Sequence, residues 1–280
     1  MFVSLEPCSH HGRTPPCVDA IIAAGVGRVV VGIGDPDPRV SGKGLDTLRA
    51  ADIQVTVSPS DEEARSVDPS YFRHRETGLP TVVLKYAMTL DGSVAAADGS
   101  SRWISGEESR ADSHRLRARM DAVVVGAGTL RADDPLLDAR IDEAGRQPRP
   151  IVIAGSEPLP GSARIWERHP LVISAIDIPI PAGDLAVVAS RDGLPEPVSA
   201  ARAIADSGYY DLLLEGGPLL AAAWWHAGLV SSGVVYLAGK IGGGKGVSPL
   251  GGLFPNVDDA KSVRIIAVIQ IGNDVRIEFE

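Results

Sequence analysis

The sequence contains few cysteines and few aromatic residues. Cys8 and Cys17 are the only cysteines among 280 residues, and aromatic residues make up 5% of the chain. A secreted domain stabilised by disulfides uses more cysteines and spreads them along the chain. We therefore exclude that class and interpret the two cysteines as a metal or redox pair in a cytoplasmic protein.

The sequence also lacks a long hydrophobic run and an excess of basic charge. It has no run of about 18 apolar residues, as a membrane-spanning helix requires, and no basic and apolar leader at its start. Its net charge is −9, which argues against nucleic acid or an anionic membrane as a partner. Small anionic ligands remain possible, because they need only a few local arginines.

Helix and strand patterns alternate in the first part of the chain. Residues 17–25 and 44–53 have the pattern of helices, and residues 27–34 and 53–58 that of buried strands. This order predicts a parallel sheet. Residues 61–79 are polar and charged without a clear apolar period, so we interpret them as a linker.

The same alternation resumes at residue 80 and continues to the end. Strands are expected at 81–88, 121–129, 149–155, 170–174 and from 211, helices at 105–119, 196–208 and from Pro218, and a hairpin within 263–280. A capping box, Ser105-Gly-Glu-Glu108, predicts the start of the first of these helices. The chain is thus expected to have an α/β fold.

Two glycine-rich turns follow predicted strands of this second part. They lie in VVVGAGT (123–129) and LLLEGGPLLAA (212–222), where a strand leads into a turn and the second turn leads into a helix. Such turns offer backbone N–H groups to an anion. Two of them in one domain favour a dinucleotide in a crevice. Neither is a G-x-G-x-x-G, so a standard Rossmann fold is poorly supported.

Four charged residues flank these turns. Arg117 and Arg140 lie on either side of the Gly-Ala-Gly-Thr turn and are candidates for binding one phosphate. Glu215 ends a buried apolar strand, a position suited to a ligand hydroxyl. Lys85 also ends an apolar run, and solvation of the strand end is an equally good interpretation of it.

Longer segments of this part resemble a known family. LKYAMTLDGSVA, DGSSRWISGEESRADSHRLRARMDAVVVGAGTLRADDPLLDAR and LEGGPLLAAAW are similar to the reductase domain of RibD proteins, the bifunctional deaminase/reductases of riboflavin biosynthesis. The resemblance covers most of residues 80–280. It implies a dihydrofolate-reductase-like fold and NADPH as cofactor. The reaction implied is reduction of 5-amino-6-(5-phosphoribosylamino)uracil, an aminouracil ribose 5′-phosphate, at the ribosyl C1′ to the ribitylamino product.

The resemblance also assigns roles to individual residues and implies a homodimer formed through the reductase domains. It places against the cofactor Ala87, Trp103, Thr129, Asp133 and the stretch Gly217, Pro218, Leu219, Leu220, Ala221, Ala222 and Ala223, with Ser156 or Gly155 at the 2′-phosphate. It places against the substrate Ser101, Arg117, Leu136, Arg140 and Glu215, with Arg117 and Arg140 on the 5′-phosphate. Lys85 and Glu215 are then the catalytic pair near the reacting carbon.

The start of the chain resembles the other half of the same family. LEPCSHHGRTPPC is similar to the zinc loop of the deaminase domain, and the likeness continues to about residue 57. Residues 1–60 are thus expected to be a truncated cytidine-deaminase-like domain, with Cys8 and Cys17 as zinc ligands. The chemistry also needs a third ligand and a glutamate, which the family takes from a preceding His-x-Glu. Only His74-Arg-Glu76 has this pattern, and it lies after the loop.

We therefore predict that this chain has no deaminase activity. The strand predicted at FVSL (2–5) begins at Met1, which predicts an open apolar edge on Phe2, Val3 and Leu5. A start codon placed too far downstream, or a gene fragment, would account for both observations. One interpretation is therefore a bifunctional deaminase/reductase whose start codon has been placed too far downstream.

Three further functions remain open. The first is a related reductase of the same fold with another nicotinamide or a deazaflavin cofactor and another substrate. The second is a non-catalytic partner of a full-length enzyme. The third, a zinc-binding regulatory or nucleic-acid module, agrees least with two lone cysteines and a charge of −9.

Overall fold

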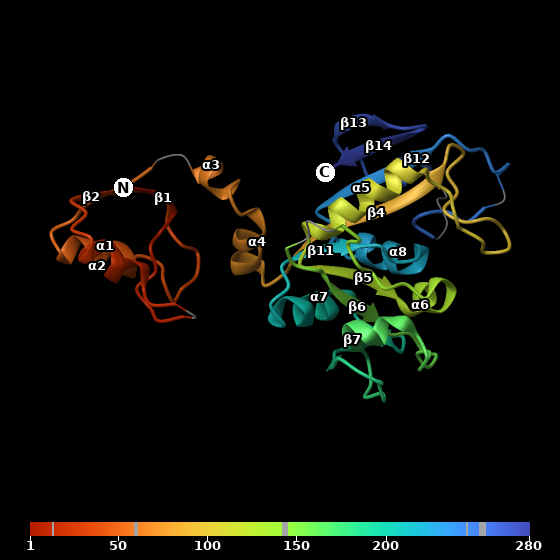
Figure 1. Cartoon of the computed structure of the whole chain (residues 1–280), viewed down its shortest axis with the longest axis horizontal. Helices are drawn as coiled ribbons and strands as arrows, with labels where there is room; N and C mark the ends of the chain where they lie inside the picture. Colours follow the sequence, from red (N-terminus) through yellow and green to blue (C-terminus); the bar gives the residue numbers. More distant parts are fainter. Residues whose placement is uncertain (13, 59–60, 142–144, 245, 252–255) are drawn as a thin grey trace. The chain divides into compact units, whose positions relative to one another are not determined.

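The computed structural model describes residues 1–12, 14–58, 61–141, 145–244, 246–251 and 256–280. The chain divides into two compact units, Met1–Leu79 and Pro80–Glu280 (Figure 1). Each unit has its own sheet and its own hydrophobic core. They are described in turn.

The first unit contains a parallel sheet of three strands with the order β1-β2-β3. Its elements are β1 (Phe2–Leu5), α1 (Cys17–Ala23), β2 (Arg28–Ile33), α2 (Lys43–Ala50) and β3 (Gln54–Val57), as the sequence predicted. Its core consists of Val18, Ile21, Val29, Val31, Leu45, Leu48 and Ile53. Strand β1 is an edge strand on which Phe2 is 84% exposed, whereas Val3 and Leu5 are half-buried. The predicted open apolar edge is therefore confirmed for Phe2 only.

The segment interpreted as a linker forms two short helices, α3 (Asp61–Arg65) and α4 (Pro69–Thr77). Helix α4 has strong local signals at both ends: Asp68 accepts a hydrogen bond from the Tyr71 backbone N–H, and Gly78 ends the helix in the left-handed conformation. Both helices belong to the first unit. The linker role stays a prediction, and α4 combines a buried Phe72 side chain, 5% exposed, with polar contacts.

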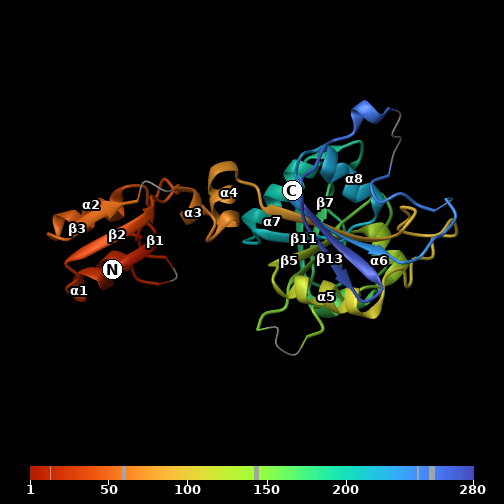
Figure 2. The same ribbon diagram turned by 90° about the horizontal axis from the view of Figure 1, so that it is seen from above.

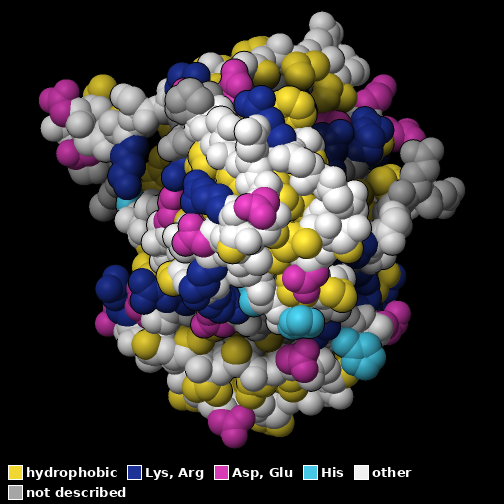
Figure 3. All heavy atoms as spheres, turned by 90° about the vertical axis from the view of Figure 1, so that its left-hand side faces the viewer, with side chains coloured by type: hydrophobic (Ala, Val, Ile, Leu, Met, Phe, Trp, Pro, Cys, Tyr) yellow, Lys and Arg dark blue, Asp and Glu magenta, His cyan; other side chains and the backbone are white. Residues whose placement is uncertain are grey.

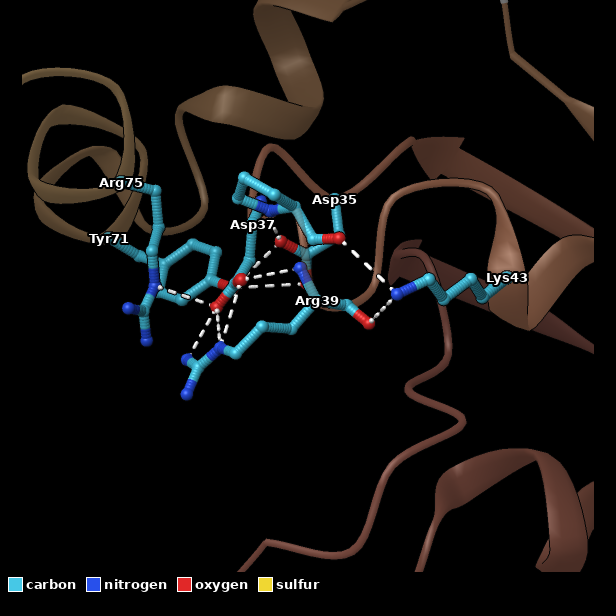
Figure 4. Close-up of polar contacts among 7 residues, drawn as sticks. Asp35, Asp37, Arg39, Lys43, Tyr71 and Arg75 are labelled. Atoms are coloured by element: carbon cyan, nitrogen blue, oxygen red, sulfur yellow. Dashed lines mark hydrogen bonds and ion pairs between the residues drawn. The ribbon is translucent and has the colours of Figure 1, made fainter.

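Those contacts join α4 to a buried acidic loop (Figure 4). The Tyr71 hydroxyl donates to the Asp35 carboxylate at 2.8 Å, and Arg75 lies 3.5 Å from the Asp37 carboxylate. Burial and the Asp35 carboxylate raise the pKa of Tyr71 to about 12. The hydrogen bond from Arg39 outweighs burial and lowers the pKa of Asp37. The loop is thus a network of buried carboxylates whose hydrogen-bond donors come from the loop itself and from α4.

The second unit contains a sheet of nine strands with the order β13-β14-β12-β4-β11-β5-β6-β7-β8. The strands are β4 (Thr81–Thr89), β5 (Ala122–Gly126), β6 (Arg149–Ile153), β7 (Leu171–Ser174), β8 (Asp184–Val187), β11 (Asp211–Leu214), β12 (Ser232–Ala238), β13 (Ile265–Ile271) and β14 (Asp274–Phe279). All pairings are parallel except those of β14 with β12 and β13. The expected parallel sheet and terminal hairpin are confirmed. Strand β12, which pairs with β4, was missed although VVYLA is an apolar run.

Helices cover both faces of this sheet, with α5 (Glu107–Ala118) on one side and α8 (Pro218–His226) on the other (Figure 2). The remaining elements are α6 (Ala127–Asp133), the 3₁₀ helix η1 (Arg164–Arg168), the short strands β9 (Ser190–Arg191) and β10 (Leu194–Pro195), α7 (Pro197–Asp206) and the 3₁₀ helix η2 (Val257–Asp259). Within the described residues, none of the helices combines the length and the apolar character needed to cross a bilayer.

The predicted capping box of α5 is wrong, although the helix is confirmed. Gly106 is the residue before the helix, and no side chain of the predicted box caps it. The Asp274 carboxylate accepts hydrogen bonds from the Gly106 backbone N–H at 2.6 Å and from the Ser109 hydroxyl at 2.7 Å. A carboxylate 168 residues away in the sequence therefore takes the place of the local cap.

On the surface shown in Figure 3, basic side chains are interspersed with acidic ones. Apolar side chains lie among them on the same face. The prediction that nucleic acid is not a partner stays a prediction.

Candidate functional site

Lys85 and Glu215 meet where the parallel pairing of β4 with β11 ends: Glu215 follows the last residue of β11, and Lys85 lies in the middle of the longer strand β4. Leu84 of β4 is in register with Leu214 of β11, and the two charged residues follow them. Parallel neighbours end at the same edge of a sheet, where ligands bind in open α/β sheets. The Lys85 Nζ lies 3.5 Å from Glu215 Oε2. Both side chains are largely buried, with 17% of Lys85 and 9% of Glu215 exposed, which contradicts the interpretation of Lys85 as a solvated strand end.

Helix α5 adds Arg117 to this pair. The Arg117 Nε donates to Glu215 Oε1 at 2.6 Å, and Nη2 donates to Oε2 at 3.0 Å, a bidentate ion pair. Its Nη1 donates to the Asp138 carbonyl at 3.0 Å. The sequence suggested a phosphate clamp at Arg117, but the structure joins most of its guanidinium to Glu215 and the backbone.

The ion pair fixes the charge state of Glu215. Burial alone would raise the pKa of this carboxyl, but the Arg117 guanidinium and the Lys85 ammonium lower it to about 2. Burial would lower the pKa of Arg117, and Glu215 raises it above its usual value. Glu215 is therefore a hydrogen-bond acceptor at neutral pH and not a proton donor.

A cavity of about 600 Å³ lies beside this ion pair. Its charged lining consists of Lys85, Arg102, Arg110, Arg117, Arg140, Arg164, Asp133, Asp134 and Glu215. The six cations outnumber the three carboxylates, so the cavity suits an anionic ligand. Arg140 lies here half-exposed, with its Nε 3.0 Å from Asp138 Oδ1.

Most of the residues assigned to the substrate line this cavity. Ser101, Arg117, Arg140 and Glu215 do so. Leu136 does not, and its neighbour Leu137 takes that place with 2% of its surface exposed. The assignment of Leu136 is thus wrong by one residue, because the loop turns between these positions.

A second cavity, of about 850 Å³, adjoins the first. The residues assigned to the cofactor that line it are Ala87, Trp103, Thr129, Asp133, Ser156, Gly217, Pro218, Leu219, Leu220 and Ala223. Ala221 and Ala222 do not line it. Ala221 lies in the core, 2% exposed, because successive residues of α8 point in different directions.

The two cavities share part of their walls. Lys85, Ser101, Trp103, Ser105, Arg110, Asp133 and Glu215 line both. The Lys85–Glu215 pair thus lies where a ligand of one cavity meets a ligand of the other. This arrangement suits transfer of a group between two bound molecules.

The second cavity fits a dinucleotide at the start of α8. Gly217 precedes the helix, and no side chain caps its N-terminus. A Cβ at Gly216 would lie 2.8 Å from Leu220 Cδ2, and a Cβ at Gly217 would lie 3.3 Å from Thr129 Oγ1. The turn therefore has little space for side chains and presents its backbone and the helix N-terminus to the cavity, as phosphate groups require.

Sequence reasoning missed several lining residues of the first cavity. His114 is the clearest case: it lies between Arg110 and Arg117 on one face of α5. Burial, with Arg117 and Arg140 nearby, lowers the pKa of His114. The spacing 110, 114, 117 is that of one helical face and would have identified it.

The two cysteines do not form a metal site in the described part of the chain. The Cys17 backbone N–H donates to Cys8 Sγ at 3.4 Å, and the hydrogen bond between the thiols raises the pKa of Cys17. Among the residues described, no three His, Cys, Asp or Glu side chains are grouped for a metal ion. The expected zinc ion thus receives no support.

Comparison with known proteins agrees with the geometry of the second unit. Residues 80–276 match the family model of the RibD C-terminal domain. The riboflavin biosynthesis protein RibD of Chlamydia muridarum is 38% identical over 292 residues, which span 100% of this chain and 79% of that protein. The structure of RibD from Acinetobacter baumannii has 30% identity and a TM-score of 0.88, covering 99% of this chain and 79% of that one.

A third similar protein also has a known structure. It is the diaminohydroxyphosphoribosylaminopyrimidine deaminase/5-amino-6-(5-phosphoribosylamino)uracil reductase of Thermotoga maritima. It has 30% identity and a TM-score of 0.83, with coverage of 99% of this chain and 78% of that one.

Proposed function

Because this chain belongs to the RibD family, we propose that its second unit is the reductase of riboflavin biosynthesis and uses NADPH to reduce 5-amino-6-(5-phosphoribosylamino)uracil to its ribitylamino product. The observation that carries the proposal is the Lys85–Glu215 pair on the shared wall of two cavities. One cavity is lined by an excess of cations, and the other adjoins a helix N-terminus after a glycine turn.

The residues of the larger cavity would hold the cofactor. Gly217 and the start of α8 face its phosphates, Thr129 and Ala87 its nicotinamide half, and Ser156 its 2′-phosphate. When bound, NADPH supplies the hydride for the reduction. The protein then has to place the substrate carbon beside the nicotinamide ring and exclude competing reactions.

The residues of the smaller cavity would hold the substrate. Arg140, Arg102 and Arg164 provide positive charge for the 5′-phosphate, and Ser101 offers a hydroxyl. Glu215 accepts hydrogen bonds from sugar hydroxyls and holds the Lys85 ammonium beside the substrate. The Lys85 ammonium then stabilises negative charge, or donates a proton, at the atoms next to the reduced carbon.

A direct test is the oxidation of NADPH by the purified chain. We expect its absorbance to fall when the aminouracil ribose 5′-phosphate is added, and to fall far more slowly with NADH. A chain that binds both ligands without turnover would instead favour the non-catalytic partner. A chain that oxidises NADPH only with another substrate would favour a related reductase.

We also propose that the chain forms a homodimer through its second unit. Strand β13 is one of the two edge strands of the nine-stranded sheet. Four of its apolar residues are exposed: Ile265 by 60%, Ile266 by 44%, Val268 by 64% and Ile269 by 44%. An apolar edge strand of this kind marks a protein interface, and a second copy can cover it symmetrically.

We propose, finally, that the first unit has no deaminase activity. The support is the pair of thiols without a third metal ligand among the described residues. Zinc-dependent release of ammonia from the diaminopyrimidine ribose 5′-phosphate by the purified chain would contradict this proposal.

A further inference from the structure

The loop of residues 134–140 carries unusual backbone strain. Asp134, Leu137 and Arg140 have φ angles of 42°, 56° and 50°, in the left-handed region. Leucine and arginine rarely adopt this conformation, because the Cβ approaches the backbone. Three such residues within seven persist only where surrounding contacts hold them in this conformation.

The strained residues are also the ones that form the wall of the smaller cavity. Asp134, Leu137 and Arg140 all line it, together with Pro135. Leu137 is 2% exposed, so its side chain is fixed by packing. The loop also supplies the Asp138 carbonyl that accepts a hydrogen bond from Arg117. A change of the loop conformation would therefore move both Arg140 and the Asp138 carbonyl to which Arg117 donates.

Helix η1 forms hydrogen bonds with this loop from both of its ends. The Arg168 Nη1 donates to the Leu136 carbonyl at 3.0 Å, and its Nη2 donates to the Pro148 carbonyl at 2.9 Å. At the other end of η1, the Arg164 backbone N–H donates to Asp134 Oδ1 at 2.8 Å. The half-buried Arg168 thus connects Leu136 of the loop with Pro148, the residue directly before β6.

A further contact supports the same loop independently of η1. The Gln147 side-chain oxygen accepts a hydrogen bond from the Ala139 backbone N–H at 2.9 Å. Gln147 lies directly before Pro148, whose carbonyl Arg168 binds. Arg168 and Gln147 therefore join the loop to one and the same neighbouring segment.

We propose that Arg168 is a positioning residue for the reductase substrate: it holds the loop 134–140 in its strained conformation so that Leu137 and Arg140 face the bound phosphoribosyl group. This inference rests on the proposed function. Arg168 does not line either cavity, so it acts through the loop and not by contact with a ligand. Its loss should affect binding of the substrate and leave binding of NADPH intact.

The test compares Arg168→Met, Arg168→Lys and the control Arg149→Met in steady-state kinetics. Arg149 also donates through Nη2, to Asp184, but lines neither cavity. We expect Arg168→Met to raise KM for the aminouracil substrate about tenfold, since hydrogen bonds of a charged donor are lost. We expect kcat and KM for NADPH to stay within about twofold, and Arg168→Lys to restore part of the affinity.

An unchanged KM for the substrate in Arg168→Met would overturn the proposal, as would an equal rise of both KM values. If Arg168→Met does not fold, Gln147→Ala takes its place, with the same expected and contrary results. If the wild-type chain has no reductase activity, the proposed function fails on its own. Hydrogen exchange of the Ala139 amide then tests whether Arg168 holds the loop 134–140 in place. Faster exchange in Arg168→Met than in the wild type supports this role of Arg168, and unchanged exchange overturns it.

Discussion

The Asp274 carboxylate of strand β14 binds the Ser109 hydroxyl in the first turn of helix α5 at 2.7 Å. The same oxygen accepts the Gly106 backbone N–H at 2.6 Å, and Asp274 is 4% exposed. The C-terminal hairpin thereby fixes the start of the helix that carries Arg110, His114 and Arg117. The Asp274 carboxylate therefore connects the C-terminal hairpin to the helix that supplies residues to the site.

Asp274→Ala should accordingly destabilise the protein. The change removes a helix cap and a negative charge at a helix N-terminus and leaves a buried hydroxyl without its acceptor, which together cost about 2 kcal/mol. Chemical denaturation measures the free energy of unfolding. Asp177→Ala, at an exposed loop position, is the matched control and should change it by less than about 0.5 kcal/mol. Equal effects of the two variants would contradict the capping role.

Glu215→Gln should lower kcat/KM of the reductase by at least about tenfold, because it removes the acceptor that organises Arg117 and Lys85. A neutral amide keeps the shape of the side chain but leaves two buried cations without their carboxylate. The measurement is NADPH oxidation at varied substrate concentration. Glu167→Gln, which alters an exposed carboxylate that lines neither cavity, is the control. Unchanged kinetics of Glu215→Gln would remove Glu215 from the assigned site.

The stability contributed by Glu215 should depend on pH in a defined window. Its pKa in the folded state is about 2, below the ordinary value of 4.5. A lowered folded-state pKa gives stability that is fully present above pH about 4.5 and is lost as the pH falls toward 2. The free energy of unfolding of the wild type should therefore fall more steeply than that of Glu215→Gln in this window. Parallel curves for the two proteins would contradict the lowered pKa.

Most of the elements that build the site could be predicted from the sequence, because their signals are local. The run VVLK, the strand DLLL before Gly-Gly and the Pro218 helix start each correspond to the observed β4, β11 and α8. Parallel pairing then brings Lys85 and Glu215 to one edge. What the sequence could not show are contacts between distant segments, such as the bidentate pair of Arg117 with Glu215, 98 residues apart.

The errors have the same physical origin. The capping box at Ser105 failed because Asp274 supplies a better acceptor from another strand. Leu136 was assigned in place of Leu137 because left-handed residues change the direction of a loop, which no periodicity reveals. The contacts of Tyr71 and Arg75 with the buried carboxylates of Asp35 and Asp37 likewise join distant segments, which local sequence signals do not reveal.

Gly217→Val should weaken the binding of NADPH with little effect on folding. The backbone of Gly217, at φ −63° and ψ 168°, is accessible to any residue. The new side chain would instead press on Thr129 Oγ1, 3.3 Å from the Cβ, and fill the turn before α8. We expect KM for NADPH to rise about tenfold or more while KM for the substrate changes little.

The control for this variant is Gly161→Ala, since a Cβ at Gly161 meets no atom within 4 Å and the residue lines neither cavity. A thermal melt establishes that both variants fold. If Gly217→Val binds NADPH as the wild type does, the turn before α8 is not part of the cofactor site.

Val268→Asp should shift the chain from dimer to monomer. Val268 is 64% exposed in the middle of β13, and a carboxylate there would face its symmetry mate across the proposed interface, where charges of one sign repel and lose water. Val187→Asp is the matched control, because Val187 is 54% exposed on β8, the opposite edge of the same sheet. Sedimentation equilibrium should show a dissociation constant at least about tenfold higher for Val268→Asp than for the wild type, with Val187→Asp unchanged. A monomeric wild type, or equal weakening by both variants, would show that the apolar edge at β13 does not pair two chains.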